Sequence, residues 1–119
     1  MTHSIKVLVA DDNRDAADSL ALLLRCEGAQ VEVAHDGEAA LRMFRDHPAD
    51  IAVLDLGMPR MGGLEVAMAL SRGTPRPFLV AVTGRGRRED RAASLEAGFD
   101  EHLTKPVAAQ QLIELLQRV

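Results

Sequence analysis

Five polar residues of the sequence stand where apolar runs end, and their side chains could together do chemistry. They are Asp11, Asp12, Asp55, Thr83 and Lys105. If each apolar run is a strand of one parallel sheet, the residues that follow the strands meet at one edge of that sheet, where such folds bind ligands. Three carboxylates, one hydroxyl and one ammonium group would then share a site.

Carboxylates this close repel one another, by about 4 kcal/mol for a pair at about 4 Å and an effective dielectric of about 20. A hard divalent cation relieves the repulsion, and Mg²⁺ is commonly bound by one or two carboxylates, a backbone carbonyl and waters. A carboxylate beside the ion can also attack phosphorus to form an aspartyl phosphate. The metal and Lys105 would neutralise the phosphoryl oxygens, and Thr83 could donate a hydrogen bond to them.

Each of these residues, taken alone, also has an ordinary structural interpretation. Asp11 and Asp12 could simply cap a helix, and Asp55 could start a turn. Thr83 and Lys105 stand beside Gly and Pro, as turn and helix-start residues often do. The functional interpretation therefore depends on all five residues falling at one edge of one sheet.

Apolar runs alternate with helical patterns along the whole chain. The predicted strands are Ile5–Ala10, Gln30–Ala34, Ile51–Leu54, Phe78–Val82 and Phe99–Leu103. The predicted helices run from Asp12 or Asn13 to Gly28, then over Glu38–Arg45, Leu64–Leu70 and Arg88–Ala97, with a last helix that carries Leu112, Leu115, Leu116 and Val119. Alternating strands and helices indicate right-handed βαβ units. The sequence thus predicts an α/β fold, a parallel sheet with helices on both faces.

The first predicted helix has an apolar stripe and the only cysteine of the chain. The stripe consists of Ala16, Leu20, Leu23 and Leu24, a spacing typical of a helix with one buried side. We expect Cys26 to pack as a small buried hydrophobe. A single cysteine cannot form an internal disulfide, which suits a reducing compartment.

The composition fits one domain, 1–119, in the cytoplasm. The 119 residues are 47% hydrophobic and 27% charged, enough for a core and a solvated surface. With 14 basic and 18 acidic residues the net charge is −4, which argues against nucleic acid or an anionic membrane as the main partner. No apolar run approaches the roughly 20 residues of a membrane span, and the N-terminus lacks a signal-peptide pattern.

Four segments resemble the receiver domain of two-component response regulators. They are Val9–Asn13, Leu54–Gly63, Val82–Gly84 and Leu103–Pro106. The resemblance covers essentially the whole chain and implies a doubly wound five-stranded sheet, flavodoxin-like, with strand order 2-1-3-4-5. It implies a switch in a phosphorelay: a domain that catalyses only its own phosphorylation and dephosphorylation, and no enzyme acting on a metabolite.

The resemblance also implies a role for each site residue. Asp55 would be the phosphoacceptor, and Asp12, Asp55 and the backbone carbonyl of Gly57 would bind Mg²⁺ directly. Asp11 would act through water, and Thr83 and Lys105 would contact the phosphoryl group. The donor would be a phosphohistidine on a sensor histidine kinase or a phosphotransfer protein. Phosphorylation would change the face made by the fourth helix, the fifth strand and the fifth helix, where partners dock.

Two features depart from the family pattern. The aromatic position of the fifth strand is His102, and an unperturbed imidazole titrates at about pH 6.5. His102 either reports phosphorylation weakly or in a pH-dependent way, or plays no switch role. Four arginines crowd the start of the fourth helix, Arg85, Arg87, Arg88 and Arg91. They form a solvated helix face, or Arg85 stands beside the phosphoryl entrance.

Several alternatives stay open. A phosphorylation-independent pseudo-receiver would keep the fold and act only through contacts. A phosphohydrolase with an aspartate nucleophile is disfavoured because it needs a second Asp where this chain has Gly57. An FMN-binding protein is disfavoured because Asp11 and Asp12 would repel the cofactor phosphate. The sequence leaves open a weak homodimer, and it does not decide between a stand-alone protein and part of a longer hybrid kinase or regulator. Residues 84–99 resemble receivers that are attached to hybrid sensor kinases.

Overall fold

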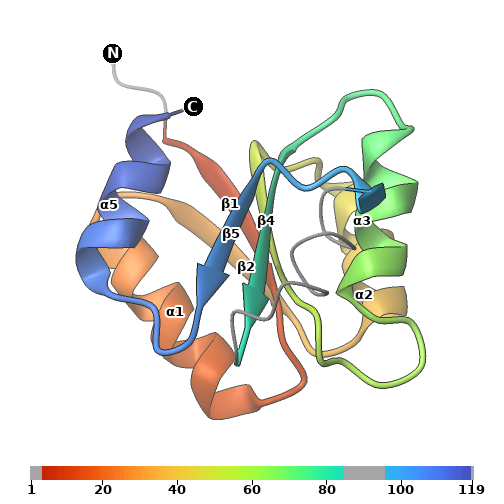
Figure 1. The fold of residues 1–119 in the computed structure, drawn as a ribbon. Helices are drawn as coiled ribbons and strands as arrows, with labels where there is room; N and C mark the ends of the chain where they lie inside the picture. The colour runs from red at the N-terminus through yellow and green to blue at the C-terminus, as the bar shows by residue number, and fades with distance from the viewer. Residues whose placement is uncertain (1–3, 85–95, 119) are drawn as a thin grey trace.

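A single parallel sheet forms the centre of the protein in the computed structural model, which describes residues 4–84 and 96–118. Its strands are β1 (Lys6–Ala10), β2 (Gln30–Ala34), β3 (Ile51–Asp55), β4 (Phe78–Thr83) and β5 (Glu101–Thr104). They lie in the order β2-β1-β3-β4-β5 (Figure 1), which confirms the predicted order. The order reverses between β1 and β3, so the carboxyl ends of these two strands form the expected ligand-binding edge.

Helices cover both faces of the sheet, as predicted. They are α1 (Arg14–Cys26), α2 (Gly37–Asp46), α3 (Gly63–Ser71) and α5 (Ala109–Gln117). Figure 1 shows α1 and α5 on one side of the strands and α2 and α3 on the other. Of the helix predicted over 88–97, only Glu96 and Ala97 lie within the described residues, where they are helical. The four arginines around its predicted start lie outside them.

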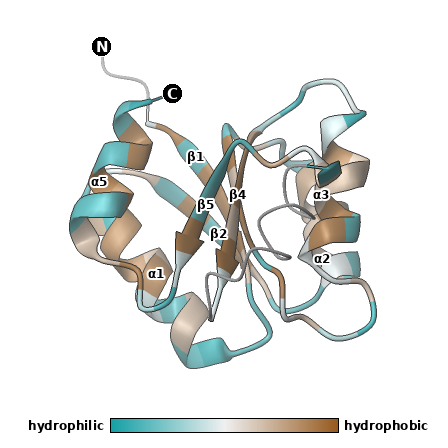
Figure 2. Cartoon of the chain, in the orientation of Figure 1, coloured by the Kyte–Doolittle hydropathy of each residue, from teal (hydrophilic) through white to brown (hydrophobic). Residues whose placement is uncertain are grey.

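Two apolar cores, one on each face of the sheet, account for the near-continuous apolar strands. Val7 and Val9 of β1 pack with α1 and α5, whereas the alternate residues Leu8 and Ala10 pack with α2 and α3. Every residue of β3 is buried. Figure 2 colours much of the central strands brown, for apolar residues, and the helices around them carry teal as well as brown residues. This two-sided burial is why β1 from Val7 onward and β3 up to Leu54 show no polar alternation.

The buried stripe of α1 differs in part from the predicted one. The buried residues are Ala17, Leu20, Ala21 and Leu24, whereas Leu23 is 39% exposed. Cys26 is exposed as well, so its predicted burial is wrong. Buried positions recur here at the three- and four-residue steps of a helix face, and Leu23 and Cys26 fall off that face.

The cap of α1 is Asn13, which resolves the predicted choice between Asp12 and Asn13. The side chain of Asn13 accepts a hydrogen bond from the backbone N–H of Ala16, at 3.1 Å. Asp36 caps α2 in the same way through the N–H of Ala39, at 2.7 Å. Because Asn13 satisfies the helix start, Asp12 does not serve as the cap.

The fifth strand begins two residues later than predicted, at Glu101. Just before it, the carboxylate of Asp100 accepts the backbone N–H of Leu79 at 2.8 Å. The same carboxylate pairs with the guanidinium of Arg76 through two hydrogen bonds, at 2.9 and 3.2 Å. The backbone N–H of Asp100 also donates to the carbonyl of Leu79, at 2.8 Å, so a side chain and the backbone together tie this segment to β4.

Candidate functional site

The strand ends bring the predicted site residues to one edge of the sheet. Asp11 follows β1, Asp55 ends β3, Thr83 ends β4 and Lys105 follows β5. The sheet pairing continues into these ends, because the N–H of Lys105 donates to the carbonyl of Thr83 at 2.7 Å. The hydrogen bonds between the parallel strands therefore hold these residues at the edge of the sheet.

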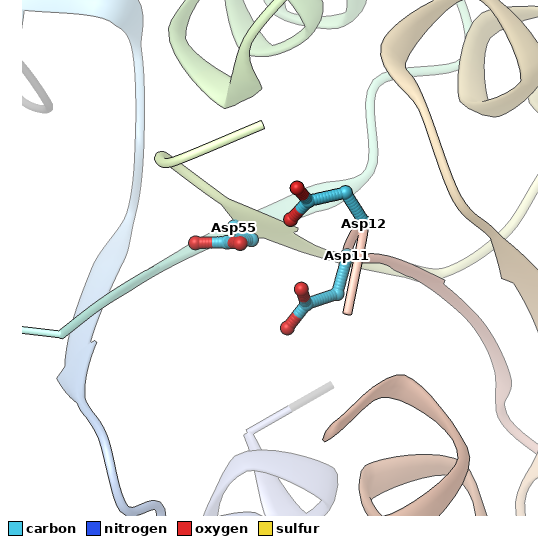
Figure 3. Close-up of side chains that lie close together, drawn as sticks. All are labelled: Asp11, Asp12 and Asp55. Carbon is cyan, nitrogen blue, oxygen red and sulfur yellow. The ribbon is translucent and has the colours of Figure 1, made fainter. Parts of the chain in front are cut away.

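The three aspartates form one acidic cluster. Asp11, Asp12 and Asp55 each offer a carboxylate oxygen, and these oxygens all lie within 4.8 Å of one another. In Figure 3 the carboxylates of Asp11 and Asp12 turn toward that of Asp55. Asp11 and Asp55 are only 2% and 7% exposed, whereas Asp12 lies at the surface. The cluster is thus open to solvent on the side of Asp12.

Lys105 provides the positive charge of the cluster. Its Nζ lies 3.2 Å from Oδ2 of Asp11 and 3.6 Å from Oδ2 of Asp55. Burial alone would lower the pKa of Lys105, but the two carboxylates outweigh it and raise that pKa above its ordinary value. The ammonium therefore stays charged at neutral pH, bridging Asp11 and Asp55.

Asp55 is held in place by the loop that follows it. Its Oδ1 accepts the backbone N–H of Gly57 at 3.0 Å. Burial and the charge of Asp11 nevertheless raise the pKa of Asp55, against the lowering effects of the Gly57 N–H and of Lys105. In the protein alone, the ionised form of Asp55 is therefore less favoured than that of an ordinary aspartate.

The donor set fits a hard divalent cation. Three carboxylates against one ammonium leave an excess of negative charge at the cluster. The pKa of Asp55 is raised first by burial and then by the charge of Asp11. Oxygen ligands with an open, solvated side match the way Mg²⁺ is bound, with part of its water shell kept.

Thr83 lies at this edge of the sheet, whereas His102 does not. Thr83 is 5% exposed at the end of β4, so the structure brings it to the edge where Asp55 ends the neighbouring strand. His102 lies within β5 opposite Ala81, before the strand end, with both ring nitrogens buried. It therefore belongs to the sheet face and is not part of the acidic cluster.

The loop after Asp55 approaches the strand end closely. A Cβ at Gly63, the first residue of α3, would lie 2.6 Å from the backbone oxygen of Asp55. Arg60, in the same loop, has a left-handed backbone with φ of 62°, a conformation that costs an ordinary residue free energy. The chain bends tightly here to bring α3 against the site.

One residue near the site was missed by the sequence reasoning. Nδ1 of His35 lies 3.2 Å from the backbone oxygen of Asp11. His35 directly follows β2, so the rule that selected the residues after the other strands would have found it if applied to this strand as well.

Comparisons with known proteins show the family and agree with the fold. A family model described as the response regulator receiver domain matches residues 7–117. The response regulator MprA of Mycobacterium ulcerans is 44% identical over 111 residues, which are 92% of this chain and 47% of that protein. The MprA protein of Mycobacterium tuberculosis is 43% identical over the same length. The chain spans about half the length of these curated relatives.

Solved structures show the same architecture. A CheY-like receiver domain protein from Methanospirillum hungatei superposes with a TM-score of 0.90 at 28% identity, covering 98% of this chain and 93% of that one. Chemotaxis protein CheY4 of Vibrio cholerae gives a TM-score of 0.90 at 28% identity, covering 98% of this chain and 99% of that one.

In residues 4–84 and 96–118, no helix has both the length and the apolar character of a membrane span.

Proposed function

This chain belongs to the response regulator receiver domains, and from that premise we propose that Asp55 is the residue that accepts the phosphoryl group. The observation that carries this proposal is the position of the Asp55 carboxylate, which is buried in the acidic cluster with the ammonium of Lys105 at 3.6 Å. Both carboxylate oxygens of Asp11 are already engaged, one by Lys105 at 3.2 Å and the other by the N–H of Asn13 at 2.9 Å.

We further propose the ligands of the metal. Asp12, Asp55 and the backbone carbonyl of Gly57 would hold Mg²⁺, and Asp11 would act through a bound water. When bound, Mg²⁺ supplies positive charge that favours the ionised form of Asp55 and offsets the charge of the transferring phosphoryl group. The solvent-facing position of Asp12 supports this assignment, since Mg²⁺ keeps several of its waters.

The transfer itself would proceed by in-line displacement at phosphorus. One carboxylate oxygen of Asp55 forms the new O–P bond while the P–N bond of the donor phosphohistidine breaks and its electron pair returns to the imidazole ring. Lys105 neutralises a phosphoryl oxygen, and the hydroxyl of Thr83 donates a hydrogen bond to another. Loss of the group is the attack of water on phosphorus, which releases phosphate and regenerates the Asp55 carboxylate.

The donor belongs to a known class, because response regulators receive their phosphoryl group from histidine kinases. For this chain we propose a sensor histidine kinase or a phosphotransfer protein in the cytoplasm, with no direct contact to nucleic acid or membrane. Beside Lys105 lies an apolar hollow of about 420 Å³ lined by Leu20, Leu23 and Val107, among others. An apolar surface next to the phosphoacceptor supports docking of a donor protein.

The response would pass from the site to β5. We propose that Thr83 moves toward the phosphoryl group and that His102 responds, weakly or in a pH-dependent way. The position of Thr83 at the end of β4, paired with Thr104 of β5, supports a connection between the two strands. Equal partner binding by His102→Ala and wild type, phosphorylated or not, would exclude a switch role for His102.

Intact mass after incubation with Mg²⁺ and acetyl phosphate tests the proposed function. Wild type should gain one phosphoryl group that hydroxylamine removes, and Asp55→Asn should gain none. The pseudo-receiver alternative is not favoured, because the acidic cluster and Lys105 are all in place. It would be reinstated if the wild type stayed unmodified and bound no beryllofluoride in the presence of Mg²⁺.

A further inference from the structure

His35 contacts the acidic loop through a backbone atom and not through a carboxylate. Its Nδ1 lies 3.2 Å from the carbonyl oxygen of Asp11. A carbonyl oxygen can only accept a hydrogen bond, so Nδ1 must carry the proton. This fixes the ring as a donor and joins the loop after β2 to the loop after β1 by a side chain.

The other polar groups of Asp11 are held as well. Its N–H donates to the carbonyl of Ala34, at 3.0 Å. Its Oδ1 accepts the N–H of Asn13 at 2.9 Å, and its Oδ2 faces Lys105 at 3.2 Å. With the bond from His35 to its carbonyl, Asp11 is restrained on both sides of its Cα.

The restraint on the Asp11 carbonyl reaches Asp12. The carbonyl of Asp11 and the N–H of Asp12 belong to one planar peptide group, so holding the carbonyl also sets the direction of the backbone at Asp12. The side chain of Asp12 is exposed, and burial does not fix it. The orientation of its carboxylate toward Asp55 (Figure 3) therefore depends on that peptide.

We propose that His35 is a positioning residue of the acidic site: by donating a hydrogen bond to the Asp11 carbonyl, it holds the Asp11–Asp12 peptide so that the Asp12 carboxylate faces Asp55. His35 touches neither the phosphoryl group nor the metal in this role. The inference rests on the proposed function in one respect, the assignment of Asp12 as a Mg²⁺ ligand.

Three variants of the whole chain test the role of His35. His35→Ala removes the donor, whereas His35→Asn places an amide N–H at the position of Nδ1. His47→Ala is the matched control, because His47 is a second histidine, exposed after α2 and 3.6 Å from Glu32. Mg²⁺ affinity is measured from the backbone amide shifts of Asp12 and Gly57 in NMR titrations without any phosphodonor.

The loss of one hydrogen bond predicts that His35→Ala binds Mg²⁺ about 3- to 10-fold more weakly. His35→Asn and His47→Ala should bind like the wild type, and ring ¹⁵N shifts should show a protonated Nδ1 at His35. Unchanged Mg²⁺ affinity in His35→Ala, equal loss in His35→Asn, or an unprotonated Nδ1 would overturn the proposal.

The readout separates this inference from the proposed function. If the wild type binds Mg²⁺ and His35→Ala weakens the binding, the positioning role stands even when acetyl phosphate leaves Asp55 unmodified. If the wild type is phosphorylated and His35→Ala binds Mg²⁺ normally, the function stands and the positioning role falls. A wild type without Mg²⁺ affinity would overturn the positioning role.

Discussion

The ionisation of Asp55 is set by its neighbours. Burial and Asp11 raise the pKa of its carboxyl above the ordinary value of 3.8, against the Gly57 N–H and Lys105. Between about pH 4 and that raised pKa, the folded protein binds a proton at Asp55 more readily than the unfolded chain does. Stability from this group therefore falls as the pH rises through that window and stays lower above it.

Replacing Asp55 with Asn should therefore stabilise the metal-free protein at neutral pH. The amide keeps an oxygen for the N–H of Gly57 but removes one of the clustered charges. We expect the midpoint of thermal unfolding to rise by a few degrees at neutral pH, with the gain fading as the pH falls toward about 4, where wild-type Asp55 is protonated. Differential scanning calorimetry without metal measures this.

Mg²⁺ should reduce the difference in the midpoint of thermal unfolding between Asp55→Asn and the wild type. The ion stabilises the wild type, whereas Asp55→Asn has lost one of the proposed ligands. Asp18→Asn, at an exposed position of α1, controls for the loss of one negative charge and should leave the pH profile unchanged. A neutral-pH destabilisation in Asp55→Asn would contradict the account of the acidic cluster.

At the scale of the elements, the contact between α3 and β3 fixes where Asp55 lies. A Cβ at Gly63 would stand 2.6 Å from the Asp55 backbone oxygen and 3.0 Å from its carbonyl carbon, so Gly63→Ala must push the two elements apart. We expect a loss of about 1–3 kcal/mol in unfolding free energy and slower phosphorylation by acetyl phosphate.

Gly73→Ala is the matched control for this contact, because its nearest atoms would lie at 3.7 Å, an ordinary contact. Urea denaturation and the rate of adduct formation compare the two variants. Equal stability and equal rates in both would show that the close approach of α3 does not position Asp55.

The loop between β3 and α3 contains a strained residue, Arg60, with φ of 62°. Arg60→Gly relieves the strain of the left-handed conformation, which costs about 1–2 kcal/mol, though the added freedom of the unfolded chain cancels part of the gain. We expect a net stabilisation of about 0.5–1 kcal/mol in urea denaturation.

Arg72→Gly provides the comparison for Arg60→Gly. Arg72 is also an exposed arginine, but its backbone is right-handed, with φ of −90°. Glycine should destabilise the protein there by about 0.5–1 kcal/mol, since it only adds freedom to the unfolded chain. The same sign of change at both positions would show that the backbone conformation of Arg60 carries no strain.

At the scale of the whole molecule, the sequence predicted what depends on local pattern. Buried strands read as apolar runs, and the parallel arrangement places the residues after them at one edge, so Asp11, Asp55, Thr83 and Lys105 were found together. The parallel arrangement and the grouping of these residues follow from the βαβ rule and the sheet geometry. The strand order came from the resemblance to receivers.

Contacts between distant loops could not be predicted in this way. The ion pair of Arg76 with Asp100 and the hydrogen bond of His35 to Asp11 join segments that are 24 residues apart. Periodicity describes which face of an element is buried and does not describe which side chain reaches across from another loop. The exposure of Leu23 has a similar cause, because apolar spacing admitted two neighbouring stripes and packing selected one.

The central claim of this account is that Asp55 carries the phosphoryl group, and borohydride reduction tests it most directly. Reduction converts a phosphorylated aspartate to homoserine, and tryptic peptides Val7–Arg14 and Asp46–Arg60 separate Asp55 from the other two aspartates of the cluster. After acetyl phosphate and Mg²⁺, we predict homoserine at position 55 alone, and none when Mg²⁺ is chelated. Homoserine at position 11 or 12, or an unmodified Asp46–Arg60 peptide, would contradict the account.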